Sequence, residues 1–455
     1  MKLLSILFCC LLCFPLFSAE TVVQGNINGF DTKTIKLAVV EDFITSNKKY
    51  IAESTIQEGS FKLVIKLEEV QQLFLKVEDK ESSFFAEPGK VYNLLLSYDL
   101  SKNEGRAYNK ILDLKMAYPK AGELNQKIKS FNGEMRDFFA ENHEKFIVKN
   151  ASKEIENFIG KMEAEEKYQS PAFVENYVRY ALANLKDINQ EPKKALFESY
   201  LQGQDVLYHH KEYMNFFLQF FQEDFGQFCI TKEGAKLLRA IMFEKDMEQS
   251  LKLIEAGKSF KQRALAELYF INGLFEVYHK KTIEQESNLA MLTQLSEKAS
   301  NPEARQIAKS VLNALEAYGK EQVAPAFSLY NQKGELLQLS DFKGKPVYLN
   351  FWADWSIPSL KQLSVLKKLH QDYGDKIHFV SINLDEDPEK MNQIIADREL
   401  KWTFLHYNND YEIREKYQVK AVPSYYLIDE NGKMLNAYAP GPVEIERKLY
   451  QMSQQ

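Results

Sequence analysis

The hydrophobic pattern of the chain changes twice along its length and divides it into three regions. Between residues 21 and 99, apolar and other residues alternate, most clearly at Phe61, Leu63 and Ile65. A period of two is typical of a β-strand with one buried face. Residues 35–40, 72–77 and 91–96 are further strand candidates, and glycines at 29, 59 and 89 mark turns. We expect a small antiparallel β-sandwich, or alternatively a barrel, over residues 20–105.

The second region, residues 106–320, follows a helical period. One predicted helical face is formed by Val174, Tyr177, Val178, Ala181, Leu182 and Leu185. Similar faces occur at residues 237–242 and 265–275, and Asn301-Pro302 is typical of a helix start. Glycine and proline are sparse, and no motif repeats at a fixed period. The pattern predicts a bundle of about half a dozen helices or more.

The third region, residues 321–455, alternates between strand and helix patterns. We expect strands at residues 347–351, 377–384 and 424–429, and helices at residues 358–373 and 388–398. A turn at residues 430–433 leads into a fourth strand. Alternation of this kind predicts an α/β domain with a βαβ core and a terminal hairpin.

The first 19 residues have the pattern of a secretory signal peptide. Lys2 precedes an apolar run over residues 3–17, and Ser18-Ala19 supplies small residues for cleavage. The run is short for a membrane-spanning helix, so we expect cleavage, export to the periplasm and no spanning segment afterwards. Lipid attachment is the less favoured alternative, because Cys9, Cys10 and Cys13 lack the small residue expected before them.

Composition and charge narrow the function classes. The 455 residues include 58 Lys and Arg against 64 Asp and Glu, without a long run of one sign, which argues against nucleic-acid binding. His209 and His210 are adjacent and would point to different faces of a helix, and no other ligand-type residues accompany them. We therefore expect neither a metal nor another cofactor.

The cysteine count restricts the chemistry most. Three of the four cysteines lie in the leader, so only Cys229 remains after cleavage. A single cysteine cannot form an internal disulfide in an oxidising compartment. Because Cys229 lies between Phe228 and Ile230, we expect a buried thiol.

Residues 351–359, Phe-Trp-Ala-Asp-Trp-Ser-Ile-Pro-Ser, resemble the strand-to-helix segment of the thioredoxin superfamily. The resemblance is strongest to exported thiol-disulfide reductases of the TlpA and AhpC/TSA type, in which this segment reads Phe-Trp-Ala-x-Trp-Cys-x-Pro-Cys. Residues 324–329, 339–345, 419–424 and 427–432 match the surrounding family motifs in the correct order. Residues 20–105 resemble the β-sandwich module that often precedes such domains.

The resemblance places Ser356 and Ser359 at the positions of the two family cysteines. In the family, the first cysteine forms a thiolate at a helix N-terminus and attacks a disulfide, and the second resolves the product. A serine hydroxyl is far less acidic and forms no disulfide, so the sequence excludes this dithiol mechanism. Gln362 and Ser364 also replace the Glu and Pro of many relatives, which favours a naturally altered motif.

Hydrolysis through Ser356 would require a general base within hydrogen-bonding distance. His370, His378 and His406 lie in the same region, but no motif places one of them beside Ser356. We therefore disfavour a hydrolase.

The family fold implies a peptide groove beside a cis-proline. Its residues here would be Trp355, Ile357, Pro358, Val422 and Pro423. We expect a redox-inactive protein that binds or scaffolds envelope polypeptides and is not an enzyme. One alternative is a thiol-disulfide oxidoreductase that works through Cys229 or a partner's thiol, and another is a module that only stabilises or presents the helical region. The sequence does not define an oligomeric state.

Overall fold

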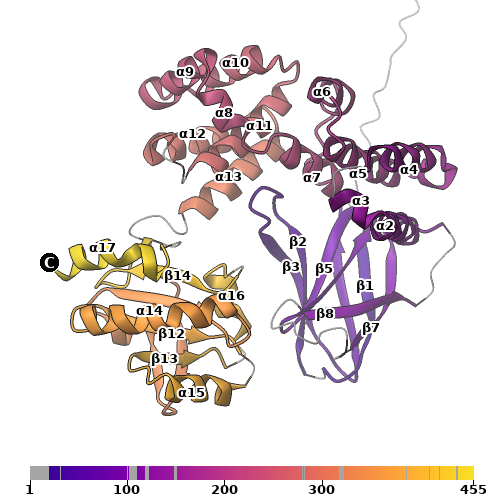
Figure 1. Cartoon of the computed structure of the whole chain (residues 1–455). Coiled ribbons are helices and arrows are strands. Elements are labelled where there is room, and N and C mark those ends of the chain that lie inside the picture. The colour runs from indigo at the N-terminus through magenta and orange to yellow at the C-terminus, as the bar shows by residue number, and fades with distance from the viewer. Residues whose placement is uncertain are drawn as a thin grey trace, which may run out of the picture.

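The computed structural model describes residues 20–454, except 31, 100, 102–109, 118–121, 148–150, 279, 281, 317–321, 386, 409, 420 and 437–438. A β-rich region, a helical region and an α/β domain follow one another along the chain (Figure 1). The leader interpreted as a signal peptide, with Cys9, Cys10 and Cys13, lies outside the described residues. Within the described ranges, no helix is long and apolar enough to cross a membrane.

The β-rich region forms an eight-stranded sheet in the order β3-β2-β5-β6-β8-β7-β1-β4. Its strands are β1 (Glu20–Ile27), β2 (Thr34–Val40), β3 (Lys48–Thr55), β4 (Ser60–Lys66), β5 (Gln71–Val77), β6 (Lys80–Ala86), β7 (Val91–Tyr98) and β8 (Lys110–Met116). Val23 and Leu63 from one end of the sheet share a single core with Leu37 and Leu75 from the other end. The sheet is therefore curved around one apolar interior.

Two details of this sheet differ from the sequence prediction. The expected arrangement was antiparallel, but β1 pairs with β7 and β6 with β8 in parallel. β8 also lies beyond the expected domain boundary at residue 105, and its pairing with β7 places it in the sheet. The sequence analysis placed these residues in the helical region, because a short apolar run alone does not distinguish a strand from a helix.

The helical region continues from α2 to α13. Its elements are α2 (Leu124–Glu141), α3 (His143–Ile147), α4 (Ser152–Ala164), η1 (Glu166–Tyr168), α5 (Ala172–Ile188), α6 (Lys193–Tyr200), α7 (Lys211–Phe220), α8 (Asp224–Cys229), α9 (Lys232–Arg239), η2 (Ala240–Glu244), α10 (Met247–Lys258), α11 (Arg263–Val277), α12 (Gln285–Lys298) and α13 (Pro302–Glu316). α11 is buried on nearly all sides. Gly273 allows this close packing, because a Cβ there would lie 2.2 Å from Cγ of Phe225.

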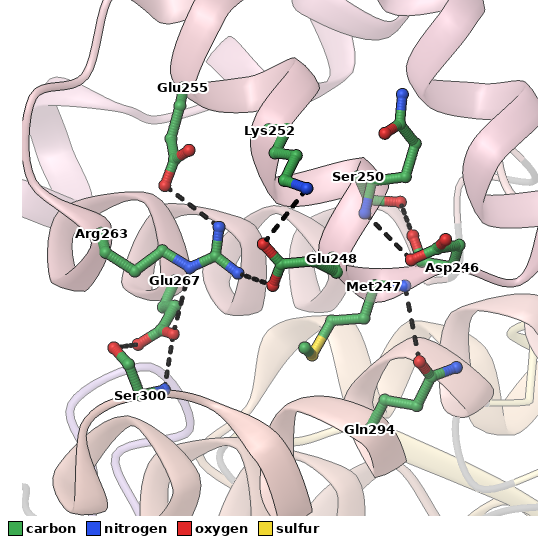
Figure 2. A network of polar contacts seen from close by, with 11 residues as sticks. Asp246, Met247, Glu248, Ser250, Lys252, Glu255, Arg263, Glu267, Gln294 and Ser300 are labelled. Atoms are coloured by element: carbon green, nitrogen blue, oxygen red, sulfur yellow. Dashed lines mark hydrogen bonds and ion pairs between the residues drawn. The ribbon is translucent and has the colours of Figure 1, made fainter.

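A buried carboxylate connects several of these helices (Figure 2). Glu267 of α11 is 1% exposed and accepts hydrogen bonds from the backbone N–H (2.7 Å) and hydroxyl (3.1 Å) of Ser300. Arg263 lies 3.5 Å from Glu267 and also pairs with Glu255 at 3.1 Å and with Glu248. A buried charge is tolerated only when it is paired in this way. The network joins α10, α11 and the turn before α13.

The C-terminal domain is built on a seven-stranded sheet in the order β10-β9-β13-β12-β11-β14-β15. Its elements are β9 (Ser328–Asn331), β10 (Leu336–Gln338), η3 (Leu339–Phe342), β11 (Val347–Trp352), α14 (Ile357–Tyr373), β12 (His378–Asn383), α15 (Pro388–Asp397), β13 (Thr403–His406), α16 (Tyr411–Lys416), β14 (Ser424–Ile428), β15 (Met434–Asn436) and α17 (Pro442–Ser453). α14 and α17 pack on one face of the sheet, and α16 packs on the other.

The N-terminal region contacts each of the other two regions, and it contacts the helices through apolar residues such as Ile44 and Phe85 as well as polar ones. Asp42, at the tip of the β2–β3 hairpin, accepts a hydrogen bond from the Ser310 hydroxyl of α13 at 2.5 Å. α16 faces the same sheet, where Tyr50 donates to Glu415 at 3.2 Å. The N-terminal sheet therefore contacts both of the regions that follow it (Figure 1).

Candidate functional site

The candidate site lies where β11 ends and α14 begins. β11 is buried at every position, and Asn350 is the single amide side chain in its otherwise apolar or aromatic sequence. Ser356 is the N-cap of α14, with an extended backbone, and its hydroxyl oxygen accepts from the Ser359 N–H at 3.3 Å. Pro358 lies in the first turn, where the missing N–H costs no helical hydrogen bond. The local sequence is therefore well suited to a sharp strand-to-helix transition.

The tertiary structure brings this turn against the loop before β14. The Ser356 hydroxyl donates a hydrogen bond to the Val422 carbonyl at 3.0 Å, and the Val422–Pro423 peptide bond is cis. Ser356 is 5% exposed. The two motifs that the sequence analysis singled out, 66 residues apart, thus meet in direct contact.

The second serine of the motif is buried. Ser359 is 1% exposed, and its hydroxyl has no hydrogen-bond partner among the described residues. The same holds for the indole N–H of Trp352. A buried hydroxyl without a partner carries a desolvation cost, so serine is a poor chemical fit at this position.

An apolar patch surrounds Ser356. Trp355 is 44% exposed and Ile357 is 66% exposed, and Pro358 is exposed as well. Val422 and Pro423 are half-buried on the adjoining loop. We call these five residues the motif surface. All five were expected from the sequence to lie together, and their two segments join at the Ser356–Val422 hydrogen bond.

A buried carboxyl group lies next to the motif, which the sequence analysis did not identify. Asp385 accepts from the Asp354 N–H at 3.0 Å and from the Asn383 side chain at 2.6 Å. Burial raises the pKa of Asp385 to about 7, although the hydrogen bond from Asn383 acts in the opposite direction. Asp354 itself pairs with Lys390 at 3.5 Å. The available signal was the position of Asn383 near the end of a predicted strand, with Asp385 directly after that strand.

The surroundings of Ser356 do not activate it as a nucleophile. Its proton is directed to a backbone carbonyl, which is not a base. His406 is occupied elsewhere: Nε2 lies 2.7 Å from the Asp385 carbonyl oxygen, and Nδ1 accepts from the Asn408 N–H at 3.0 Å. His370 packs beside Trp402, and His378 packs beside Phe342. The three histidines therefore make their contacts with residues other than Ser356.

Cys229 and the histidine pair lie in the helical region, away from this turn. Cys229 ends α8, is 2% exposed, and burial raises the pKa of its thiol to about 12.

His210 caps α7, where Nδ1 accepts from the Tyr213 N–H at 3.4 Å and Nε2 lies 3.1 Å from the Phe173 carbonyl oxygen. His209 faces Glu69 at 3.8 Å. In the part of the chain that the structure describes, no group of three His, Cys, Asp or Glu residues is placed to hold a metal ion.

A central sheet, a capped helix at the end of its middle strand and a cis-proline loop against the cap define the C-terminal domain as thioredoxin-like. Comparisons with known proteins agree. The Redoxin family model matches residues 319–451. The thioredoxin-like protein YneN of Bacillus subtilis (strain 168) is 34% identical over 148 residues, which cover 30% of this chain and 86% of that protein. The chain therefore belongs to the thioredoxin-like family.

Two further similarities cover comparable shares of the chain. The thiol-disulfide oxidoreductase ResA of Bacillus thuringiensis subsp. konkukian is 32% identical over 118 residues, which cover 26% of this chain and 66% of ResA. The match thus spans just under two thirds of ResA. A crystal structure of a putative thiol-disulfide oxidoreductase from Bacteroides vulgatus shares 26% identity over 30% of this chain and 99% of that chain, with a TM-score of 0.29.

Proposed function

We propose that this protein is an exported, non-catalytic member of the family that binds polypeptides of the cell envelope through its motif surface. The observation that carries the proposal is the Ser356–Val422 hydrogen bond at 3.0 Å. The Ser356 hydroxyl connects the N-terminus of α14 to the cis-proline loop. The family resemblance implies a reactive cysteine at this position. The binding surface is thus formed without the redox chemistry.

The loss of redox chemistry follows from the two side chains. ResA is named as a thiol-disulfide oxidoreductase, an activity that depends on thiolate attack. A helix N-terminus stabilises a nearby anion by up to about 2 kcal/mol, which is too little to make a serine hydroxyl a thiolate substitute at neutral pH. Two serines also cannot form a disulfide, so they cannot supply the two electrons that a dithiol gives to a substrate disulfide.

Polypeptide binding is supported by the exposed apolar side chains. Trp355 and Ile357 are 44% and 66% exposed beside the backbone of Val422. Aromatic residues are enriched among the residues that contribute most to protein interfaces. An extended peptide can also pair with exposed backbone while its side chains contact neighbouring apolar residues.

The alternative function, an oxidoreductase that uses Cys229, fits the structure less well. A nucleophilic thiol has to be accessible and partly ionised at the working pH. Cys229 is 2% exposed, and its pKa is raised to about 12 by burial. A partner's thiol, or a purely supporting role for the domain, are the remaining alternatives.

Export and a periplasmic location are part of the proposal and rest on the leader sequence. The described part of β1 begins at Glu20, directly after the expected cleavage site.

The redox half of the proposal is tested by dithiothreitol-driven reduction of insulin. We expect the purified native protein to remain at background, whereas a Ser356→Cys/Ser359→Cys variant should gain activity. Turnover by the native protein that disappears in Cys229→Ala would disprove the proposal and establish the alternative. Ser364→Cys, a single exposed thiol on α14, controls for non-specific thiol effects.

The binding half is tested with reduced, carboxymethylated ribonuclease as an unfolded polypeptide. All three tryptophans, Trp352, Trp355 and Trp402, lie in the C-terminal domain, and only Trp355 is exposed, so its fluorescence reports on the motif surface. Ile357→Ser should weaken binding roughly tenfold, since it removes one apolar contact worth about 1.5 kcal/mol or more. Val443→Ser removes an equally exposed apolar residue of α17 and should have no effect. Equal affinity for both variants would exclude the motif surface as the binding site.

A further inference from the structure

β6 and β8 are neighbours in the N-terminal sheet over only two residues. Parallel pairing joins Lys80 to Lys110 and Glu81 to Ile111, after which β6 continues to Ala86 and β8 continues to Met116. Beyond Glu81 and Ile111, no residue of β6 is paired with a residue of β8 in the part of the chain that the structure describes. A cleft of about 770 Å³ lies here, lined by both strands and by α2.

The register of β6 determines which of its backbone groups face the cleft. In an antiparallel pair, successive residues alternate between bonding the partner strand and pointing away from it. Phe85 points away from β5, because its N–H donates to the side-chain oxygen of Asn125 at 2.7 Å and its carbonyl accepts from the same amide at 2.8 Å. Ser83, two residues earlier, has the same orientation. Its N–H and carbonyl therefore face the cleft.

The same alternation applies to β8. Ala117 donates from its N–H to the Asn93 carbonyl at 2.8 Å, so odd-numbered residues of this segment bond β7. Leu114 and Met116 consequently direct their N–H and carbonyl groups away from β7 and toward the cleft. Two strand edges thus face each other across it.

Asn125 shows how this edge is satisfied where α2 reaches it. The side-chain amide of Asn125 offers one acceptor and one donor to Phe85, as the backbone of a neighbouring strand would. Further along the cleft, at Ser83 and Leu114, no described segment takes this role. An edge with unpaired backbone groups is a template for pairing with another extended chain.

The side chains of the cleft favour an alternating partner. Phe84 and Leu112 are buried in the sheet interior, and Leu114 and Met116 pack against the same core. Lys115 and Lys129 also line the cleft, are exposed, and have no ion pair among the described residues. Arg136 and Lys211 also line the cleft but pair with Asp137 and Glu212, and the carboxylates of Asp113 and Glu123 belong to the lining as well.

We propose that the cleft between β6 and β8 binds an extended polypeptide segment in which apolar and acidic residues alternate. The segment adds as a strand that bonds Ser83 on one side and Leu114 on the other. Its apolar side chains face Phe84 and Leu112, and its carboxylates face Lys115 and Lys129, because successive residues of a strand point to opposite faces. This site is separate from the motif surface and does not depend on the function proposed for it.

The test uses a fluorescein-labelled Val-Glu-Val-Glu-Val-Glu peptide and fluorescence anisotropy with the full protein. We expect saturable binding that weakens at least tenfold in the Lys115→Glu/Lys129→Glu variant. Lys62→Glu/Lys66→Glu, the same double charge change at two exposed positions of β4 at the far end of the sheet, should bind as the native protein does. Ile357→Ser should also leave this binding unchanged.

Backbone pairing is tested with the same peptide carrying N-methyl groups on alternate residues, which keeps its charge but removes hydrogen-bond donors. We expect this peptide, a Val-Lys-Val-Lys-Val-Lys peptide, and a Ser83→Pro variant each to reduce binding at least tenfold. The N-methylated peptide keeps the test valid if Ser83→Pro fails to fold. Absence of saturable binding, equal binding of the N-methylated peptide, or loss of binding in Ile357→Ser would each overturn the proposal.

Discussion

At the scale of single residues, the two serines of the motif have different surroundings. Ser356 makes two hydrogen bonds and is well accommodated as a helix cap. Ser359 is buried, and its hydroxyl finds no partner in the described part of the structure. Serine is therefore structurally favourable at position 356, whereas it carries a cost at position 359.

The cost at Ser359 can be measured. Ser359→Ala should raise the stability of the C-terminal domain by about 1 kcal/mol, because it removes a buried polar group that lacks a hydrogen bond. Thermal unfolding followed by tryptophan fluorescence reports on this domain alone, since all three tryptophans lie in it. Ser364→Ala, at an exposed position of α14, is the matched control and should have little effect. A lower melting temperature for Ser359→Ala would show that the hydroxyl has a partner.

Asp385 predicts a pH dependence of stability. Burial raises its pKa to about 7 in the folded protein, against about 4 for an ordinary aspartate. The folded state therefore holds the proton to a higher pH, and the contribution of Asp385 to stability falls as the pH rises from about 4 to 7. Asp385→Asn should melt at a higher temperature than the native protein at pH 8, with a smaller difference at pH 5.

The control for Asp385 is Asp372→Asn on the exposed side of α14. It should shift the melting temperature equally at both pH values. A difference for Asp385→Asn that is larger at pH 5 than at pH 8 would contradict the expected sign.

At the scale of secondary structure, the accuracy of the sequence prediction followed the strength of the hydrophobic pattern. β11, α14 and β14 lie within one residue of their predicted bounds, because each combines an apolar run with a turn or cap signal. β3 was missed, since most of its side chains are exposed and do not alternate. β6 begins Lys-Glu-Ser-Ser and gave no strand signal until Phe84.

The β2–β3 hairpin shows how one element connects two regions. The Asp42 carboxylate accepts from the Thr45 N–H at 2.6 Å, from the Thr45 hydroxyl and from Ser310 of α13. Asp42 is 2% exposed. Removing it would leave several donors without an acceptor.

We expect Asp42→Ala to destabilise the hairpin and α13 together by about 2 kcal/mol or more, because buried donors lose a charged acceptor. Hydrogen exchange should show faster exchange in residues 41–47 and in the part of α13 around Ser310. Asp42→Asn keeps one acceptor oxygen and should show a smaller effect. Faster exchange in the hairpin alone would mean that the contact with α13 contributes nothing.

At the scale of the whole molecule, the C-terminal domain contacts the N-terminal sheet through charged and polar groups. Glu415 of α16 accepts from Tyr50 and pairs with Lys76, and Glu412 lies 3.7 Å from Lys36. Contacts between exposed charges are weak and are screened by salt. Polar interfaces of this kind allow domains to move relative to one another.

Charge reversal should therefore separate the two regions. We expect Glu412→Lys/Glu415→Lys to increase the radius of gyration measured by small-angle X-ray scattering, because each substitution places a lysine opposite a lysine. High salt should increase it in the native protein in the same direction. Glu444→Lys, exposed at the start of α17, is the control and should have no effect. An unchanged radius in the double variant would show that other contacts hold the domain.

The sequence by itself determined the three-region order, the thioredoxin-like motif and the absence of its cysteines, because these depend on local periodicity and residue identity. Only the tertiary structure decided three other features. It set the strand order and parallel pairings of the first sheet, the contact of Ser356 with Val422, and the burial of Asp385. Each of these features depends on which distant segments come into contact. A local hydrophobic pattern does not show which segments these are or how favourable their contact is.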